Sequence, residues 1–189
     1  MDARIKAVTF DEENHKYFYN GKELHGITGA IGKIMGKNFP DTDVVKLATI
    51  YGSDVHKEIE NYYNNGSKIL SFEGAKWIVE YMEQFKKEHF VNKIECEVMV
   101  SDFEGTASKI DIVVRTDVGA YIFDIKTTSH FDRAYCSLQL SVYKKLYEQC
   151  YKDNIIGMFV LGTKSKRAFR ILEQEHTKID KILSINKGE

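Results

Sequence analysis

Two acidic side chains and one lysine interrupt runs of apolar residues that otherwise read as β-strands. Asp111 lies in the run 107–116 (ASKIDIVVRT), and Asp124 and Lys126 lie in the run 119–126 (GAYIFDIK). Ile, Val, Phe and Tyr dominate both runs, as is typical of strands that pack in a sheet. Side chains alternate along a strand, so Asp124 and Lys126 are expected on the same face.

The short turn between the two runs brings the carboxylates together. A turn of two residues at 117–118 would pair Thr116 with Gly119, giving an antiparallel hairpin. Counting outward from that pair places Asp111 opposite Asp124, and another turn length moves this position by a residue or two. Two half-buried carboxylates repel each other unless a positive charge lies between them. Magnesium or manganese, bound through oxygen ligands, would remove the repulsion, coordinate phosphate and activate a water molecule.

Lys126 adds a positive charge one step along the face of Asp124. Its ammonium could orient the attacking water or neutralise the charge on a pentacovalent phosphate. The plainer interpretation is an exposed ion pair between Asp124 and Lys126 on an edge strand. These two runs alone leave both interpretations open.

Side chains at helical spacing could complete such a site. In YGSDVH, Gly52 lets a helix pack closely, and His56 can then reach the carboxylates. An imidazole ligand would shift the preference toward manganese. Glu60, one turn further, could hydrogen-bond the imidazole or tune the site from outside. Gln139 and Tyr143 share a face of a later helix, where they could contact substrate, brace the lysine or simply pack.

The 189 residues are expected to form one domain, because this length suits a single hydrophobic core. Pro40, in the break GKNFPDTD, separates a small hairpin segment at 1–40 from the core at 41–189. Within the first segment short strands flank residues 11–14, and an Asn-Gly pair at 20–21 marks a further turn.

The core shows a mixed order of elements. A strand that follows a helical crossover usually lies parallel to its neighbour, so the predicted class is α/β with a mixed sheet flanked by helices. The expected elements are a helix from Asp43, a helix at 72–88, strands at 93–101, 107–116 and 119–126, a helix at 131–151, strands at 155–162 and near 168–174, and a terminal helix.

Charge and composition limit the class of protein. The net charge of -1 argues against a general nucleic-acid coat protein. Residues 1–125 carry 15 basic and 21 acidic side chains, and residues 126–189 carry 12 and 7. An acidic part followed by a basic part suits a metal-dependent enzyme that acts on a polyanion. Lys164, Lys166, Arg167 and Arg170 could hold backbone phosphates, or could form a solvated surface.

Cysteine spacing and hydropathy give further expectations. Cys96, Cys136 and Cys150 never form a CxxC motif, so we expect buried thiols rather than a disulfide framework or a zinc site. No stretch approaches the roughly 18 to 20 apolar residues of a membrane span, and the first residues lack the apolar core of a secretion signal. The expected location is therefore the cytoplasm, without a membrane partner.

The sequence resembles the PD-(D/E)XK nuclease superfamily, in particular its RecB-like exonuclease branch. That branch includes phage exonucleases and mitochondrial genome maintenance exonucleases, and residues 10–31 look like the amino-terminal segment of small phage members. The resemblance implies a restriction-endonuclease-like core and metal-dependent hydrolysis of DNA. Four motifs occur in family order: Gly52-x-x-x-His56, Asp111, Asp124-Ile125-Lys126 and Gln139-x-x-x-Tyr143.

The same resemblance implies roles for individual residues. It makes Lys126 the catalytic lysine and places Gln139 and Tyr143 at the border of a DNA channel. An acidic position in the preceding strand matches Glu97, with Glu95 as a rival. The implied metal ligands are His56, Asp111, Asp124 and the carbonyl of Ile125.

One departure from the family concerns substrate fit. Ser108 stands three residues before the first aspartate, where the family usually has glycine, and with Lys109 it is expected to face the substrate. The serine narrows the space for backbone or phosphate without removing a ligand. Some relatives hold an iron–sulfur cluster with four cysteines, which three scattered cysteines cannot reproduce. The expected cofactor is therefore one or two Mg²⁺ or Mn²⁺ ions, with no iron–sulfur cluster.

The leading hypothesis is a DNA exonuclease of recombination, repair or phage genome processing. Its substrate would be single-stranded DNA or a duplex with ends, and oligomers are compatible with the superfamily, some of whose members form rings. A second hypothesis is a noncatalytic DNA-binding or assembly module that kept the fold. A third is a structural ion-pair cluster that binds no nucleic acid. The intact Asp-x-Lys motif argues against the second hypothesis.

Overall fold

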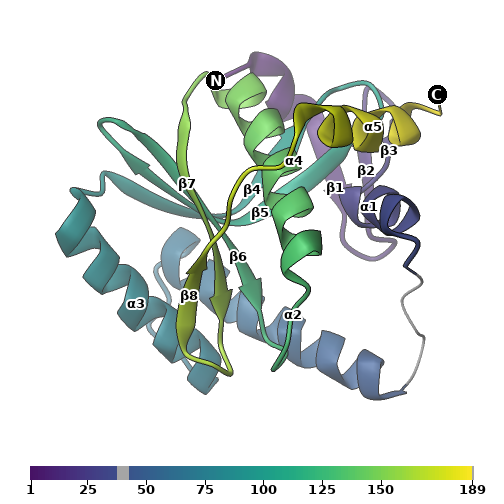
Figure 1. The fold of residues 1–189 in the computed structure, drawn as a ribbon. Helices are drawn as coiled ribbons and strands as arrows, with labels where there is room; N and C mark the ends of the chain where they lie inside the picture. The colour runs from purple at the N-terminus through teal and green to yellow at the C-terminus, as the bar shows by residue number, and fades with distance from the viewer. Residues whose placement is uncertain (38–42, 189) are drawn as a thin grey trace.

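The computed structural model describes residues 1–37 and 43–188, so the predicted break around Pro40 lies outside the described residues. A five-stranded mixed sheet carries helices on both faces, and a small three-stranded antiparallel sheet lies beside it (Figure 1). The mixed α/β class and the small amino-terminal sheet that the sequence predicts are confirmed.

The amino-terminal sheet depends on two tight turns. The Asp11 carboxylate accepts hydrogen bonds from the backbone N–H groups of Glu13 and Asn14, which folds the first turn. His15 completes this turn in the left-handed conformation, with φ 55°. The elements of the segment are a 3-10 helix, η1 (Ala3–Ala7), and strands β1 (Val8–Asp11), β2 (Lys16–Tyr19) and β3 (Lys22–Leu24).

A short helix, α1 (Ile27–Met35), follows β3 and was not predicted from the sequence. It is nine residues long and contains Gly29 and Gly32, and glycine disfavours helices. Burial compensates for this weak propensity, because Ile27 and Ile31 are almost completely buried. Packing therefore forms a helix where local sequence gives only a weak signal.

The main sheet has the strand order β4-β5-β6-β7-β8. Its neighbours are antiparallel except for β6 and β7, which are parallel, as expected for a strand reached through a helical crossover. The first four strands have the predicted bounds, whereas the last is shorter than the predicted 168–174. The strands are β4 (Lys93–Ser101), β5 (Ala107–Thr116), β6 (Gly119–Lys126), β7 (Ile155–Gly162) and β8 (Arg167–Arg170).

The turn between β5 and β6 fixes the register of the two strands that carry the acidic residues. Thr116 pairs with Gly119 across a two-residue turn, as predicted. Gly119 has φ 144°, and a Cβ atom there would lie 2.8 Å from the backbone oxygen of Asn154. Counted outward from the turn, the last pair of the ladder is Ile112 and Phe123, and the next residue on each strand is an aspartate.

Helices cover both faces of the main sheet (Figure 1). On one face, α2 and α3 pack over a core that includes Ile112 and Phe123. On the other face, α1, α4 and α5 pack over a core that includes Val113 and Ile122. The helices not yet given are α2 (Asp43–Asn64), α3 (Glu73–His89), α4 (Arg133–Tyr151) and α5 (His176–Lys187).

The regular alternation of β4 is interrupted at Glu97. Cys96 belongs to the core under α2 and α3, whereas Val98 belongs to the core under α1, α4 and α5. In a regular strand, residues two apart point to the same face, so Cys96 and Val98 would belong to the same core. Glu97, between them, has φ 54°, an uncommon conformation for a residue other than glycine. The strand therefore turns over at this acidic residue.

Replacing Gly119 tests the importance of the turn. Gly119→Ala should lower the free energy of unfolding by about 2 kcal/mol or more, because the backbone region suits glycine alone and Asn154 blocks a Cβ atom. Gly21→Ala is the matched control, since Gly21 also has positive φ, 78°, but nothing lies within 4 Å of a Cβ atom there. Urea denaturation should show the larger loss for Gly119→Ala, and equal losses would contradict the role given to the contact with Asn154.

Candidate active site

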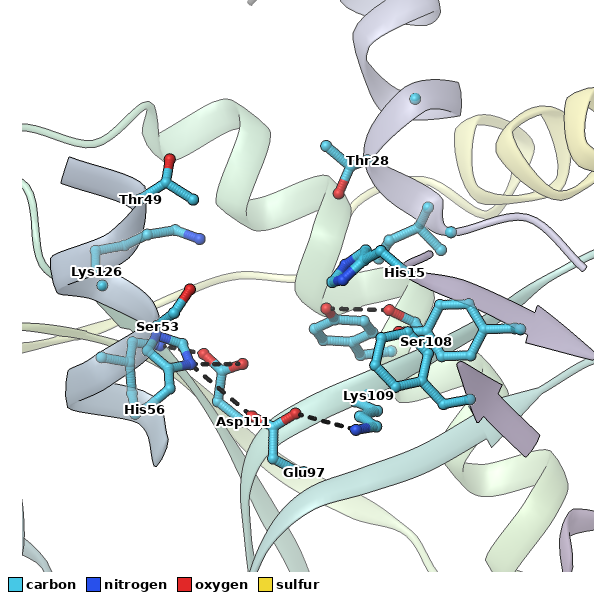
Figure 2. A pocket seen from close by; sticks show the side chains of 18 of the residues that line it. His15, Thr28, Thr49, Ser53, His56, Glu97, Ser108, Lys109, Asp111 and Lys126 are labelled. Carbon is cyan, nitrogen blue, oxygen red and sulfur yellow. Dashed lines mark hydrogen bonds and ion pairs between the residues drawn. The ribbon is translucent and has the colours of Figure 1, made fainter. Parts of the chain in front are cut away.

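A cleft of about 1310 Å³ opens between the amino-terminal segment and α2. Figure 2 shows His56 and Lys126 on one side of the cleft, His15 and Thr28 on the other, and Asp111 on its floor. The predicted site residues that line the cleft are His56, Glu60, Glu97, Ser108, Lys109, Asp111, Ile125, Lys126 and Tyr143.

Three side chains in the cleft form a possible metal site. The Nδ1 atom of His56 lies 3.6 Å from Oδ1 of Asp111 and 3.9 Å from Oε1 of Glu97. One ligand atom from each residue lies within 4.8 Å of the others. Two carboxylate oxygens and an imidazole nitrogen are suitable ligands for a divalent cation. Of the residues that the structure describes, these three could hold such an ion, and its identity is not defined by them.

Helix α2 brings the imidazole to the sheet. Val55 and Ile59 are completely or almost completely buried on either side of His56, so they fix the rotation of the helix. A Cβ atom at Gly52 would lie 3.1 Å from the hydroxyl oxygen of Thr127, so glycine permits the close approach that the sequence predicts. His56 is thereby held beside Asp111 of β5 and Glu97 of β4.

Asp111 is anchored by the backbone of the neighbouring strand. Its Oδ2 atom accepts a 2.6 Å hydrogen bond from the backbone N–H of Ile125, just beyond the last pair of the β5–β6 ladder. Its Oδ1 atom is the one that lies near His56. One oxygen therefore holds the side chain in place while the other faces the cleft.

Asp124 and Lys126 form a partly buried ion pair rather than an exposed one. The Nζ atom of Lys126 lies 2.8 Å from Oδ2 of Asp124 and donates a hydrogen bond to Oδ1 at 3.1 Å. Asp124 is 1% exposed, and β6 is the central strand of the sheet. The interpretation of these residues as an exposed pair on an edge strand is therefore wrong. The salt bridge lies beside the possible metal site, but Asp124 is not one of the three clustered ligands.

A line of side-chain hydrogen bonds continues from Lys126 into the protein. The Lys126 ammonium donates to Oε1 of Gln139 at 3.3 Å, and Nε2 of Gln139 donates to the Tyr143 hydroxyl at 3.2 Å. Ser108 donates to the same hydroxyl at 3.4 Å and is also a hydrogen-bonding partner of Tyr17 in β2. Gln139 is thus a brace for Lys126, one of the roles that the sequence suggests, and Ser108 links the small sheet to that brace.

The pKa values follow from burial and from crowded charge. Burial raises the pKa of Asp111 to about 7; His56 acts to lower it, and Asp124 and Glu97 raise it. Burial alone would lower the pKa of His56, but Asp111 and Glu97 outweigh this effect and raise it to about 9. For Lys126, likewise, Asp124 outweighs burial and holds the pKa above its usual value. Unless His56 is protonated, the site thus has an excess of negative charge that a cation would relieve.

Other predicted residues lie outside the cluster. Glu60 forms an ion pair with Lys57 at 2.9 Å and not the suggested hydrogen bond to His56. Glu95, the rival of Glu97, forms a 2.6 Å ion pair with Arg115 and does not line the cleft. Lys109 lies 3.9 Å from Glu97, so its positive charge partly offsets the negative charge of the candidate site.

The remaining expectations concern features away from the cluster. Cys96, Cys136 and Cys150 are free and buried, as predicted. Within the described part of the chain, no helix is long and apolar enough to cross a membrane. The cleft wall of Phe10, His15 and Thr28 was missed, because these residues come from a short strand, a turn and the unpredicted α1, and none of them belongs to a recognised motif.

No protein family matches the sequence, and no curated protein matches it. A solved structure of a proposed exonuclease from Eubacterium rectale is similar to this chain, with a TM-score of 0.49 and 15% sequence identity. The match covers 96% of this chain and 84% of that chain. A likeness at this level does not define the site, so its chemistry rests on the side chains described above.

Glu97 and Glu95 offer a matched test of the metal site. Glu97→Gln should weaken Mn²⁺ binding by about tenfold or more, because a neutral amide replaces one of three clustered ligands. Glu95→Gln should leave binding nearly unchanged, since Glu95 pairs with Arg115. The measurement is the rise in melting temperature on titration with MnCl₂. Equal weakening in the two variants would exclude the cluster as the site.

Metal binding should strengthen as pH rises from 6 to 8.5. The raised pKa of Asp111 keeps its carboxyl protonated below about pH 7, and the raised pKa of His56 keeps the imidazole charged below about pH 9. Both protons oppose coordination, so the metal must displace them and its affinity falls as they are gained. Calorimetric titration with MgCl₂ should show tighter binding and less proton release at the higher pH. Binding that is independent of pH would contradict this linkage.

Proposed function

We propose that this protein is a divalent-metal-dependent deoxyribonuclease that hydrolyses phosphodiester bonds, beginning at DNA ends. The observation that carries the proposal is that His56, Glu97 and Asp111 cluster in one cleft, whose lining also includes Lys126, the partner of the buried Asp124. The ordered family motifs in the sequence support the same conclusion. We also propose that residues 1–189 act as one nuclease domain, since the amino-terminal segment and the core both line this cleft.

The ligand set fits a metal ion of the Mg²⁺ or Mn²⁺ type. His56, Glu97 and Asp111 would hold the ion, and the carboxylates that raise the pKa of Asp111 would be neutralised by it. Asp124 and the Ile125 carbonyl are the further ligands that the family resemblance implies. When bound, a divalent cation supplies charge neutralisation for phosphate oxygens and lowers the pKa of a bound water.

Lys126 supplies a fixed positive charge for the phosphate. Its raised pKa keeps the side chain protonated at neutral pH, so it is a donor of hydrogen bonds rather than a general base. Asp124 and Gln139 hold the ammonium from two directions, which limits its movement. A preorganised cation of this kind stabilises negative charge that develops on phosphate oxygens in the transition state.

The two aspartates of the hairpin differ in exposure and therefore in the role that we propose for each. Asp111, tied to the Ile125 backbone N–H, presents one oxygen to the cleft. Asp124, almost fully buried, holds Lys126 instead of facing solvent. This arrangement supports the proposal that a metal ion and the Lys126 ammonium contact the same phosphate group.

A cleavage assay with end-labelled and circular DNA tests the proposal. The wild-type protein should degrade linear DNA with Mg²⁺ or Mn²⁺, lose activity with EDTA and spare closed circles. Asp111→Asn and Lys126→Ala should each lower the rate by about 100-fold or more, because they remove a ligand and the fixed cation. Glu95→Gln and Lys86→Ala are matched controls on residues outside the cleft, and both should keep the wild-type rate.

Each contrary result has a distinct meaning. Cleavage that persists in both site variants would exclude this site as the origin of activity. DNA retention in a gel-shift assay without cleavage by the wild type would favour the noncatalytic binding module. Cleavage of circular DNA at the linear rate would replace the exonuclease with an endonuclease, and faster cleavage of RNA of the same sequence would change the substrate class.

A further inference from the structure

The wall of the cleft opposite Lys126 carries three aromatic rings from the amino-terminal sheet. Tyr17, Phe10 and His15 form a continuous row, with ring centroids 4.7 Å apart for Phe10 and Tyr17 and 5.0 Å apart for Phe10 and His15. All three line the cleft. Figure 2 shows the His15 imidazole on the side of the cleft that faces Lys126 and Ser53.

His15 is the ring of this row that remains accessible. Tyr17 is only 7% exposed, and Phe10 is half-buried, with the Lys109 ammonium 4.2 Å from its ring centroid. His15 is exposed, and its left-handed backbone conformation, with φ 55°, holds it at the cleft. Among the residues that the structure describes, the aromatic neighbour of its imidazole is Phe10, which it meets in an edge contact. A planar group entering the cleft can therefore stack on this ring.

The row of rings is close to the candidate metal site. Phe10 contacts Lys109, Lys109 lies 3.9 Å from Glu97, and Glu97 lies 3.9 Å from His56. Two side chains thus separate the rings from the imidazole that would hold the metal. A base attached near the reacting phosphate would reach the wall, because one nucleotide carries both groups.

We propose that His15, supported by Phe10, stacks on an unpaired nucleobase next to the phosphate that is cleaved, so that the substrate is a DNA strand with an unpaired end. The proposal rests on the proposed nuclease function and names its substrate class. In a duplex, neighbouring base pairs cover both faces of each base, whereas an unpaired base leaves a face free for an aromatic ring. Stacking tolerates every base, which suits an enzyme that degrades DNA without sequence preference.

Abasic substitution measures stacking directly. Single-stranded 12-mers with one abasic site, scanned along the strand, are bound to the wild-type protein in EDTA, and the dissociation constant is read from fluorescence anisotropy. At one position near the end, loss of the base should weaken binding about fivefold or more. A blunt duplex of the same sequence should bind more weakly than a duplex with an unpaired tail.

Two variants separate the aromatic ring of His15 from its imidazole nitrogens. His15→Asn removes the ring with a residue that accepts the left-handed conformation, so the abasic penalty should disappear. His15→Phe keeps a ring without the imidazole nitrogens and should keep the penalty. His176→Asn, on an exposed histidine outside the cleft, is the matched control and should behave as the wild type. Melting temperatures verify that each variant is folded.

The outcomes separate this inference from the nuclease function. Cleavage of intact DNA with no abasic penalty, or with a penalty that survives in His15→Asn, would overturn stacking and leave the nuclease intact. Loss of the penalty in His15→Phe as well would show that the imidazole contacts phosphate or a base edge, which also overturns stacking. A wild-type protein that neither binds nor cleaves DNA would overturn the function and the inference together.

Discussion

Excess negative charge at the centre of the main sheet is the constraint on which the rest of the site depends. Asp111 of β5 and Asp124 of β6 lie at neighbouring positions on adjacent strands, and Glu97 approaches from β4 on the other side of β5. The Lys126 ammonium balances one of these charges. His56 can balance another only by holding a proton, which Asp111 and Glu97 favour by raising the pKa of the imidazole to about 9. Repulsion in a partly buried environment is costly. A cation that binds the carboxylates not paired with Lys126 would reduce this repulsion most simply.

The fold meets this constraint by giving each charged group a separate anchor. The Ile125 backbone N–H holds Asp111, and the Gln139 amide holds Lys126. A reversal of the strand at Glu97, where φ is 54°, allows that carboxylate to join residues from another part of the sheet. Backbone strain of this kind costs of order 1–3 kcal/mol and persists only where surrounding packing enforces it.

Local sequence patterns predicted the elements that carry the site but not its full composition. Strong apolar runs and the two-residue turn fixed β4, β5, β6 and the Thr116–Gly119 register. Glu97 could not be separated from Glu95, because residues two apart share a face in any regular strand. The backbone reversal at Glu97 and the ion pair of Glu95 with Arg115 depend on tertiary packing. The same applies to α1, whose glycine-containing sequence forms a helix through burial.

The end of α5 connects two segments that lie far from it in the sequence. The Asn186 side-chain amide donates hydrogen bonds to the backbone oxygens of His25 and Gly26, where α1 begins, and to the Thr106 hydroxyl. Residues about 160 positions apart are thereby joined at one rim of the cleft. During synthesis this rim cannot be assembled until translation has reached the last helix. A growing chain would therefore contain the candidate ligands His56, Glu97 and Asp111 well before the cleft had both of its sides.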